Sequence, residues 1–263
     1  MVKLFKMADK FITYKIFDAY KEVRAFTSVK QTIEGEISPR YTGNNGSEFE
    51  LNRLKLAKAL GIGVNQLIFP NQTHSSSVVN LCGIPNSPIN DTDALVTNQP
   101  GICLCVQTAD CVPVLLYDPV HNVIAAVHAG WRGTVTLIVK EAIQEMFKQY
   151  LSSPPDIIAV IGPSIGPEKY EIGEEVMNAV MSTISYAGNS INKQPTGKFH
   201  LNLWEANRQI LIDCGVRSNN IEISGHCTFT GKDRFFSARR DGVETGRLVS
   251  GIMLEIGQQF KKT

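Results

Sequence analysis

Residues 111–128 constrain the fold of this chain more than any other segment, because two apolar runs there flank a short turn. This pattern predicts a β-hairpin that turns at Pro119 and Val120. The corresponding register places Cys111 opposite His128, and opposed residues of an antiparallel pair have Cβ atoms roughly 4.5–5.5 Å apart on one face. A thiolate and an imidazole are therefore expected side by side, at the end of the hairpin farthest from its turn.

These two side chains make a metal site possible. Zinc binds Cys sulfur at about 2.3 Å and His nitrogen at about 2.0–2.1 Å, so one ion could contact both residues. The candidate third ligand is His74, which lies in a polar loop, where functional residues concentrate. Two His and one Cys leave one tetrahedral position open, as in catalytic rather than structural zinc sites. Ordinary hairpin residues and a solvated loop histidine are the alternative interpretation.

The composition is that of an ordinary globular protein. The chain has 263 residues, of which 43% are hydrophobic and 19% charged, and this length is ample for a buried core. No repeat, low-complexity block or composition shift divides the sequence. We therefore expect a single catalytic domain over residues 1–263.

Charge and hydropathy limit the classes of partner. The net charge is +1 and no basic run is present, which argues against nucleic-acid binding through the phosphate backbone. The first 17 residues do not predict a signal peptide, and no window approaches the roughly 18 apolar residues of a membrane-spanning helix. We expect a cytoplasmic protein with reduced cysteines and no membrane or nucleic-acid partner, whereas the charge says little about small-molecule substrates. The oligomeric state stays open.

Hydrophobic periodicity indicates an α/β fold. Helical spacing marks residues 51–60, 134–150 and 201–214. Strand-like apolar runs mark residues 66–69, 101–108, 112–117, 123–127 and 156–161. Since helices and adjacent strands are mixed rather than alternating regularly, we predict a mixed, largely antiparallel sheet flanked by helices.

Further candidate residues lie near these elements. Asp110 precedes Cys111 and could orient a ligand or act as a base, although Asp at a strand start is also a common turn residue. Arg132 lies between two glycines at the start of a predicted helix, where an anion could bind. Arg239 and Arg240 follow an apolar run and suit a phosphate or carboxylate ligand. A solvated pair of arginines beside a turn is the alternative.

Five motifs together resemble the laccase-domain family, which has been called multicopper polyphenol oxidase (YfiH-like) and is described as purine nucleoside phosphorylases with adenosine deaminase activity. The motifs are Gln72-Thr-His74, Ala109-Asp110-Cys111-Val-Pro113, Ala126-Val-His128-Ala-Gly-Trp-Arg-Gly133, Ile161-Gly-Pro-Ser-Ile-Gly166 and Arg239-Arg240-Asp241-Gly242. The resemblance runs from about residue 50 to residue 255. It implies a single-domain α/β sandwich and one metal ion, usually zinc, held by the residues that correspond to His74, Cys111 and His128.

The chain departs from the pattern of this family at three places. The family carries Thr-Arg-x-Gly-Gly-Val-Ser near its N-terminus, whereas residues 26–45 of this chain lack the glycine pair. The residue after the first ligand is Ser75 instead of the usual Gly, and Ala238 replaces an aromatic residue or His before the double arginine. The metal triad itself is intact.

The resemblance implies a zinc-dependent purine nucleoside enzyme. Its reactions would be phosphorolysis of adenosine, inosine and methylthioadenosine, and deamination of adenosine. Asp110 would carry a proton or orient a ligand. Arg132, Arg239 or Arg240 would hold the phosphate oxygens bidentately.

Two other enzyme classes stay open. A single-copper phenol oxidase could use the same His2Cys set, because copper(II) outranks zinc in raw affinity. Five histidines, however, are too few for a laccase-type four-copper assembly. A cysteine hydrolase could use Cys111 as nucleophile and His128 as base. His74 distinguishes these classes, because a metal site needs a third ligand and a Cys–His dyad does not.

Overall fold

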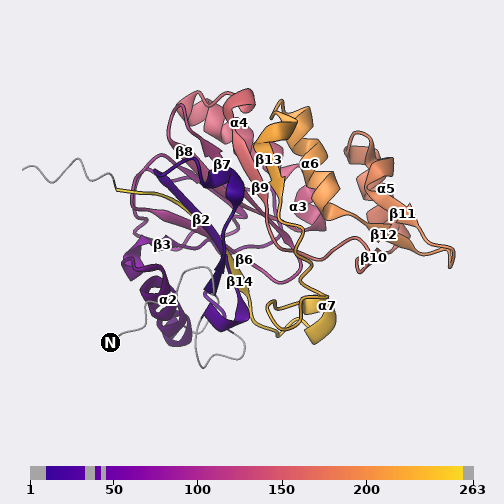
Figure 1. Cartoon of the computed structure of the whole chain (residues 1–263), viewed down its shortest axis with the longest axis horizontal. Coiled ribbons are helices and arrows are strands. Elements are labelled where there is room, and N and C mark those ends of the chain that lie inside the picture. Colours follow the sequence, from indigo (N-terminus) through magenta and orange to yellow (C-terminus); the bar gives the residue numbers. More distant parts are fainter. Residues whose placement is uncertain (1–9, 33–38, 43–45, 257–263) are drawn as a thin grey trace, which may run out of the picture.

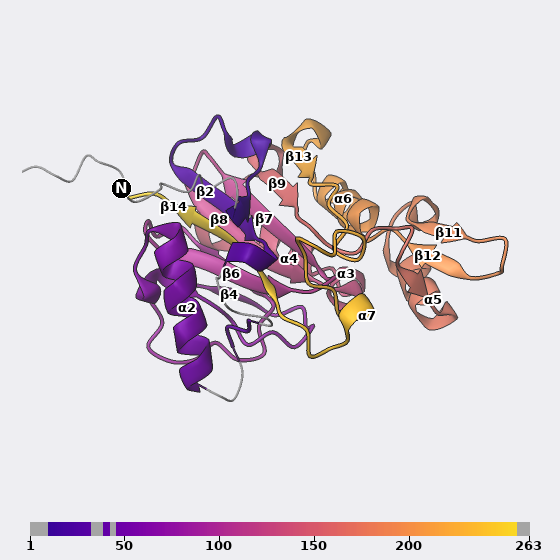
Figure 2. The same cartoon turned by 60° about the horizontal axis from the view of Figure 1, so that its bottom comes forward.

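The computed structural model describes residues 10–32, 39–42 and 46–256. Two β-sheets pack face to face at its centre, and helices cover the outer faces of this sandwich (Figures 1 and 2). Three strand pairs among the described residues are parallel and the others are antiparallel. The mixed, largely antiparallel α/β sandwich expected from the sequence is thus confirmed. Within the described ranges, none of the helices has the length and apolar character needed to cross a bilayer.

The larger sheet has six strands, with the predicted hairpin at its centre. In spatial order these strands are β13 (Ile221–Ile223), β9 (Ile158–Ile161), β7 (Val112–Asp118), β8 (Val123–Ala129), β5 (Ala94–Thr97) and β4 (Val78–Asn80). Every residue of β7 and β8 is buried. Burial on both faces explains why the two strands have continuous apolar sequences rather than alternating ones.

The second sheet has five strands and joins distant parts of the chain. Its strands, in spatial order, are β1 (Phe11–Ile12), β2 (Val23–Ser28), β14 (Leu248–Leu254), β6 (Cys103–Thr108) and β3 (Leu67–Ile68). The first residue of β14, Leu248, pairs with Thr108 at the end of β6. This pairing brings the residue before β14, Arg247, toward the segment that carries Cys111.

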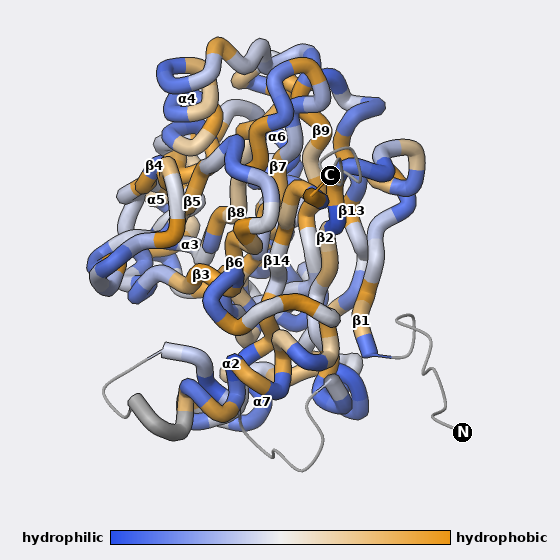
Figure 3. The backbone as a smooth tube through the Cα atoms, turned by 90° about the vertical axis from the view of Figure 1, so that its left-hand side faces the viewer, coloured by the Kyte–Doolittle hydropathy of each residue, from blue (hydrophilic) through white to orange (hydrophobic). Residues whose placement is uncertain are grey.

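Apolar side chains fill the three interfaces between layers. One cluster joins the two sheets and includes Leu104, Leu115, Tyr117, Ile124 and Ile252. On the outer face of the larger sheet lie α4 (Ile138–Tyr150) and α6 (Leu203–Asp213), and on that of the smaller sheet lies α2 (Gly46–Leu60). Figure 3 shows hydrophobic colour along the inner strands and mixed colour along α4 and α2. Helices with one buried side therefore enclose an apolar centre.

A small third sheet extends from one side of the sandwich. It contains β10 (Glu171–Ile172), β12 (Phe199–Leu201) and β11 (Ile191–Lys193), and α5 (Glu174–Thr183) packs beside it. Figures 1 and 2 both place this unit away from α2, beyond α6. The segment before β10 returns to the main sheets and brings Tyr170 near the hairpin end.

The register of the hairpin differs from the sequence prediction by two residues. Asp118 pairs with Val123, and Pro113 rather than Cys111 pairs with His128. The predicted pairing of Cys111 with His128 is therefore wrong. A shift of two residues leaves each side chain on its original face, so Cys111, directly before β7, still approaches His128.

A four-residue loop over residues 119–122 accounts for the shift. The carboxylate of Asp118 accepts hydrogen bonds from the backbone N–H groups of Val120 (2.8 Å) and His121 (3.3 Å). Asn122 ends the loop with φ of 52°, a left-handed conformation that Asn tolerates well. These side-chain bonds stabilise a longer loop than the predicted two-residue turn.

The helix predicted over residues 134–150 is divided in two. The first part, α3 (Trp131–Val135), begins one turn earlier than expected, and α4 follows it. Leu137 separates them with φ of 61°, which a continuous helix cannot accommodate. Because Val135 and Ile138 contact the same apolar cluster, the hydrophobic spacing continues across the break and does not reveal it.

Candidate metal centre

Three side chains from separate segments meet beside one end of the hairpin. His74 lies in the loop after β3, Cys111 directly precedes β7, and His128 belongs to β8. One ligand atom of each residue lies within 4.8 Å of the others, and His74 Nε2 is 3.8 Å from Cys111 Sγ. Ligand atoms of a tetrahedral zinc ion are about 3.6 Å apart at ordinary bond lengths. The His, Cys, His set therefore fits one ion.

The carboxylate of Asp93 holds two of these ligands in place. His128 Nδ1 donates to Asp93 Oδ1 at 2.7 Å, which leaves Nε2 of the ring for the metal centre. The backbone N–H groups of Thr73, His74 and Ser75 donate to the same carboxylate. Ser75 Oγ adds a bond of 2.8 Å, which glycine at this position could not form. Asp93 thus fixes both the loop of the first ligand and the ring of the third.

Backbone conformation and a glycine bring the ligands close together. His74 and Asp110 have left-handed φ values of 62° and 89°, which are uncommon for residues other than glycine. Gly130 lies against the centre, and a Cβ atom there would be 2.9 Å from Cys111 Sγ. The local chain is therefore shaped around the three ligand atoms.

The charges of Cys111 and His128 depend on each other. Burial raises the pKa of the Cys111 thiol, but the neighbouring His128 and His74 outweigh burial and bring this pKa down to about 6. Burial lowers the pKa of His128, but Cys111 and Asp93 outweigh it and raise this pKa to about 9. At neutral pH the cysteine is thus a thiolate, the form that binds metals, and a metal ion bound here would displace the imidazole proton.

Asp110 uses its carboxylate to tie neighbouring segments to the metal centre. Asp110 Oδ1 accepts a hydrogen bond from Thr228 Oγ1 at 2.6 Å. Asp110 Oδ2 accepts from Ser237 Oγ at 3.0 Å and from the backbone N–H of Arg239 at 2.7 Å. Both oxygens are therefore engaged in holding the loop that carries Cys111.

Arg240 has a structural set of contacts. Its guanidinium donates to the backbone carbonyls of Thr228, Phe229 and Phe235 at 2.6–2.8 Å. It also pairs with the carboxylate of Asp241 at 2.6 Å. This arrangement directs the guanidinium toward its own segment of the chain.

Arg132 and Arg239 each lie over an aromatic ring near the centre. Arg239 Cζ lies 5.2 Å from the ring centroid of Tyr170, and Arg132 Cζ lies 4.5 Å from that of Trp131. Burial and the charge of Cys111 raise the pKa of Tyr170, while Arg239 and Arg132 oppose this rise. Both arginines therefore act on the same side of the site as Tyr170.

A pocket of about 350 Å³ opens beside the triad. All three candidate ligands line it, together with Arg40, Thr42, Gln72, Gln107, Thr108, Ala109, Ala238, Val243 and Arg247. His74 is exposed, Cys111 is half-buried and His128 is buried. The pocket therefore gives solvent and small molecules access to the centre from the His74 side.

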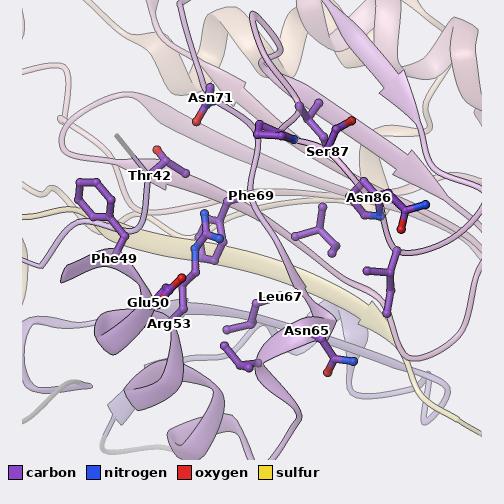
Figure 4. A pocket seen from close by; sticks show the side chains of 16 residues that line it. Thr42, Phe49, Glu50, Arg53, Asn65, Leu67, Phe69, Asn71, Asn86 and Ser87 are labelled. Carbon is purple, nitrogen blue, oxygen red and sulfur yellow. The ribbon is translucent and has the colours of Figure 1, made fainter. Parts of the chain in front are cut away.

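A second cavity, of about 450 Å³, lies between α2, β3 and the loop 84–89. Figure 4 shows Arg53 beside Phe69 in its wall, with Cζ 5.1 Å from the ring centroid. Thr42 lines both cavities. None of the three candidate ligands lines the second cavity, so the smaller pocket is the one with metal-binding chemistry.

Three residues of the site were not predicted from the sequence. Asp93 directly precedes β5, the neighbour of β8, and an acidic residue before a buried strand was the available signal. Arg247 stands in the same way before β14. Nothing in the local sequence distinguishes Arg40, because its partners are far away in the chain.

The segment over residues 26–45, where the chain departs from the family pattern, is only partly described. Residues 33–38 and 43–45 lie outside the described residues. The described part contributes Arg40 and Thr42 to the pocket. At the other departure before the double arginine, Ala238 lines the same pocket.

Comparison with known proteins gives consistent matches along most of the chain. Residues 38–255 match the family described as "Multi-copper polyphenol oxidoreductase laccase". The purine nucleoside phosphorylase of Bacteroides thetaiotaomicron is 38% identical over 260 residues, which cover 93% of this chain and 96% of that protein. Adenosine deaminase RL5, from an unknown prokaryotic organism, is 36% identical over 245 residues, covering 88% and 93%.

The fold also matches a solved structure. The crystal structure of the hypothetical protein YfiH from Bacillus licheniformis aligns with a TM-score of 0.84 at 30% sequence identity. The alignment covers 94% of this chain and 97% of that one. The structural similarity therefore extends over nearly the whole chain, and the family match over residues 38–255 includes the segments that carry the candidate ligands.

Proposed function

The chain belongs to the multi-copper polyphenol oxidoreductase laccase family, and on this premise we propose that it is a zinc-dependent purine nucleoside enzyme. Its activities are phosphorolysis of adenosine, inosine and methylthioadenosine, and deamination of adenosine. The observation that carries the proposal is the meeting of His74, Cys111 and His128 ligand atoms beside an accessible pocket. Relatives named purine nucleoside phosphorylase and adenosine deaminase support the choice of substrate class. One catalytic domain, spanning residues 1–263, carries both activities.

Zinc is the proposed metal, bound by His74, Cys111 and His128. The three-ligand set with one open position is typical of catalytic zinc sites. A carboxylate that accepts a hydrogen bond from a ligating histidine, as Asp93 does from His128, is also usual there. When bound, zinc supplies a Lewis acid that lowers the pKa of water to about 7. Copper could bind the same donors, and metal analysis of the purified protein distinguishes the two.

The residues around the centre have separate proposed roles. Asp93 keeps the His128 ring oriented, and the thiolate of Cys111 lowers the positive charge of the site. We assign Asp110 to positioning Cys111 rather than to proton transfer, because both of its oxygens already accept hydrogen bonds. In this proposal Cys111 and His128 act at the centre itself. Asp93 orients the ring of His128, and Asp110 fixes the loop that carries Cys111.

The two proposed reactions share the substrate and differ in the attacking group. In phosphorolysis, phosphate replaces the purine base at C1′ of the ribose. In deamination, water replaces the amino group at C6 of adenine. Arg132 and Arg239 are proposed to contact the substrate from the Tyr170 side, and Arg240 supports the chain segment that carries Arg239.

A cysteine hydrolase is the second candidate function. The pKa of the Cys111 thiol, which burial raises but His128 and His74 bring down to about 6, gives a thiolate beside a protonated imidazole. Cysteine nucleophiles are activated by such a pair. The position of His74 favours the metal enzyme, since a dyad makes no use of a second histidine 3.8 Å from the sulfur.

Turnover of adenosine with and without inorganic phosphate tests the proposal. We expect adenine and ribose 1-phosphate only when phosphate is present. Deamination needs only water, so we expect inosine without phosphate, and inosine together with hypoxanthine from its phosphorolysis when phosphate is present. Chromatography of the reaction mixture separates these products. A preparation treated with a chelator and then dialysed is the control and should form neither product.

Absence of turnover with adenosine, inosine and methylthioadenosine in zinc-loaded protein would contradict the proposed function. Full activity after complete removal of metal would instead favour the cysteine hydrolase.

A further inference from the structure

Two arginine side chains lie next to each other in the metal pocket. Arg40 Nη2 donates to the backbone carbonyl of Val243 at 2.8 Å, and Arg247 Nη2 donates to the same oxygen at 3.0 Å. Both side chains line the pocket that contains the three candidate ligands. One shared acceptor thus holds two positive groups side by side.

Two guanidinium groups that donate to the same oxygen repel each other. Burial strengthens this repulsion because less water screens it. The pKa of Arg247 reflects this environment, since burial lowers it and the charge of Arg40 lowers it further. Like charges are stable at close range when an anion lies between them. The arrangement therefore matches a pocket that receives a negatively charged ligand.

The described residues that line the pocket do not supply this anion. None of them is Asp or Glu. Glu244 pairs with Arg40 at 3.2 Å, but its side chain is 91% exposed, and ion pairs at such positions contribute little. The charges of Cys111, Glu244 and Asp110 raise the pKa of Arg247, but burial and Arg40 outweigh them. The pair Arg40–Arg247 thus has a net positive charge directed into the pocket.

The backbone fixes the two arginines before any ligand arrives. The N–H of Arg247 donates to Pro39 O at 2.8 Å, which joins the two segments beside Arg40. Arg247 Nη1 donates to the carbonyls of Thr245 and Gly246. Among the described residues, no acceptor contacts Arg247 Nε or Arg40 Nη1.

We propose that Arg40 and Arg247 form the subsite for a phosphate group in the metal pocket. This inference rests on the proposed function and identifies the residues that hold its second substrate. A phosphate oxyanion between the two guanidinium groups removes their repulsion and accepts charge-assisted hydrogen bonds from both. The two residues of this subsite are not among the arginines predicted from the sequence, which are Arg132, Arg239 and Arg240.

Calorimetric titration of zinc-loaded protein with inorganic phosphate, in the absence of nucleoside, tests the proposal without turnover. We expect Arg247→Gln and Arg40→Gln each to weaken phosphate binding at least about tenfold, the size of one lost charge-assisted bond. Arg247→Lys keeps the positive charge but loses the planar guanidinium that binds phosphate through two donors. Its phosphate affinity should lie between those of wild type and Arg247→Gln. Titration with adenosine 5′-monophosphate separates a nucleotide phosphate from inorganic phosphate as the source of the same group.

Two matched variants serve as controls. Arg208→Gln removes a half-exposed arginine of α6 that pairs with Glu205, outside both cavities, and should leave phosphate binding unchanged. Arg239→Gln tests the competing assignment. Zinc content and thermal unfolding of each variant identify any loss of folding, and Arg40→Gln provides a second test should Arg247→Gln fold poorly.

The outcomes separate the subsite from the proposed function. Weaker phosphate binding in both pocket variants supports the subsite, even in a protein without nucleoside turnover. If wild type binds adenosine 5′-monophosphate but not inorganic phosphate, weaker binding of this nucleotide in both pocket variants also supports the subsite, with a nucleotide as the ligand. Unchanged binding in Arg40→Gln and Arg247→Gln, loss only in Arg239→Gln, or no binding of either ligand by wild type overturns the subsite, whatever the deaminase activity.

Discussion

Replacing His74 with alanine is expected to remove bound zinc and nucleoside turnover together. His74 contributes one of three protein ligands, and its Nε2 lies 3.8 Å from Cys111 Sγ. Loss of a residue that only hydrogen-bonds a metal ligand typically costs about 10–100-fold in metal affinity. Loss of a direct ligand should therefore cost more than about 100-fold. Zinc per chain after dialysis and adenosine turnover, measured on the same preparation, give the two readouts.

A histidine in the loop of the hairpin provides the matched control. His121 lies in the loop at the opposite end of the hairpin, where it contacts Asp118 at 2.8 Å. His121→Ala should keep both zinc and turnover. Activity that survives in His74→Ala without zinc would contradict the metal mechanism, because a Cys111–His128 dyad would then be sufficient.

Replacing Gly130 with alanine is expected to damage the metal centre while leaving the fold intact. The added Cβ would lie 2.9 Å from Cys111 Sγ and 3.1 Å from His74 Cδ2, so at least one ligand must move. Gly130 has φ of −66° and ψ of 175°, which alanine adopts without strain. We expect zinc affinity to fall at least about tenfold, comparable with loss of a hydrogen-bond partner of a metal ligand. Competition with a zinc-binding dye measures this change.

Another glycine in an equivalent position isolates the steric effect. Gly173 precedes α5 as Gly130 precedes α3, with φ of −81° and ψ of 170°. A Cβ at Gly173 would meet no atom within 4 Å. Gly173→Ala should therefore bind zinc like wild type. Equal zinc affinity in both alanine variants would mean that no metal ion lies against Gly130.

The hairpin shows how far a local pattern predicts a site. The two apolar runs correctly predicted β7 and β8, and the faces of their side chains survived a register error of two residues. A one-residue error would have separated Cys111 from His128. The error arose in the loop, where bonds from the Asp118 carboxylate decide the length. Side-chain bonds within turns are harder to read from sequence than alternation in strands.

The parts of the site that escaped prediction depend on pairing between distant segments. Asp93 reaches His128 because β5 lies beside β8. Arg247 reaches Arg40 because β14 inserts between β2 and β6, and this strand was not predicted. A single sequence contains no direct record of such neighbours. His74, Cys111 and His128 could be chosen as candidate ligands from the sequence because they are chemically distinctive, whereas arginines are common on any surface.

Helices and strands were predicted where their spacing was regular. Helices α2 and α6 and strands β3, β6 and β9 lie within a few residues of the predicted ranges. The break at Leu137 was missed because the residues on both sides of it bury in one cluster. Hydrophobic spacing records which residues are buried, and it does not record the backbone angles between them.

X-ray absorption at the zinc edge, on protein purified without added metal, tests the central claim most directly. We predict about one zinc ion per chain, with one sulfur at about 2.3 Å and nitrogen or oxygen ligands at about 2.0–2.1 Å. The sulfur would come from Cys111 and two of the nitrogens from His74 and His128. A spectrum without a sulfur ligand, or zinc below about a tenth of an ion per chain, would contradict the metal centre.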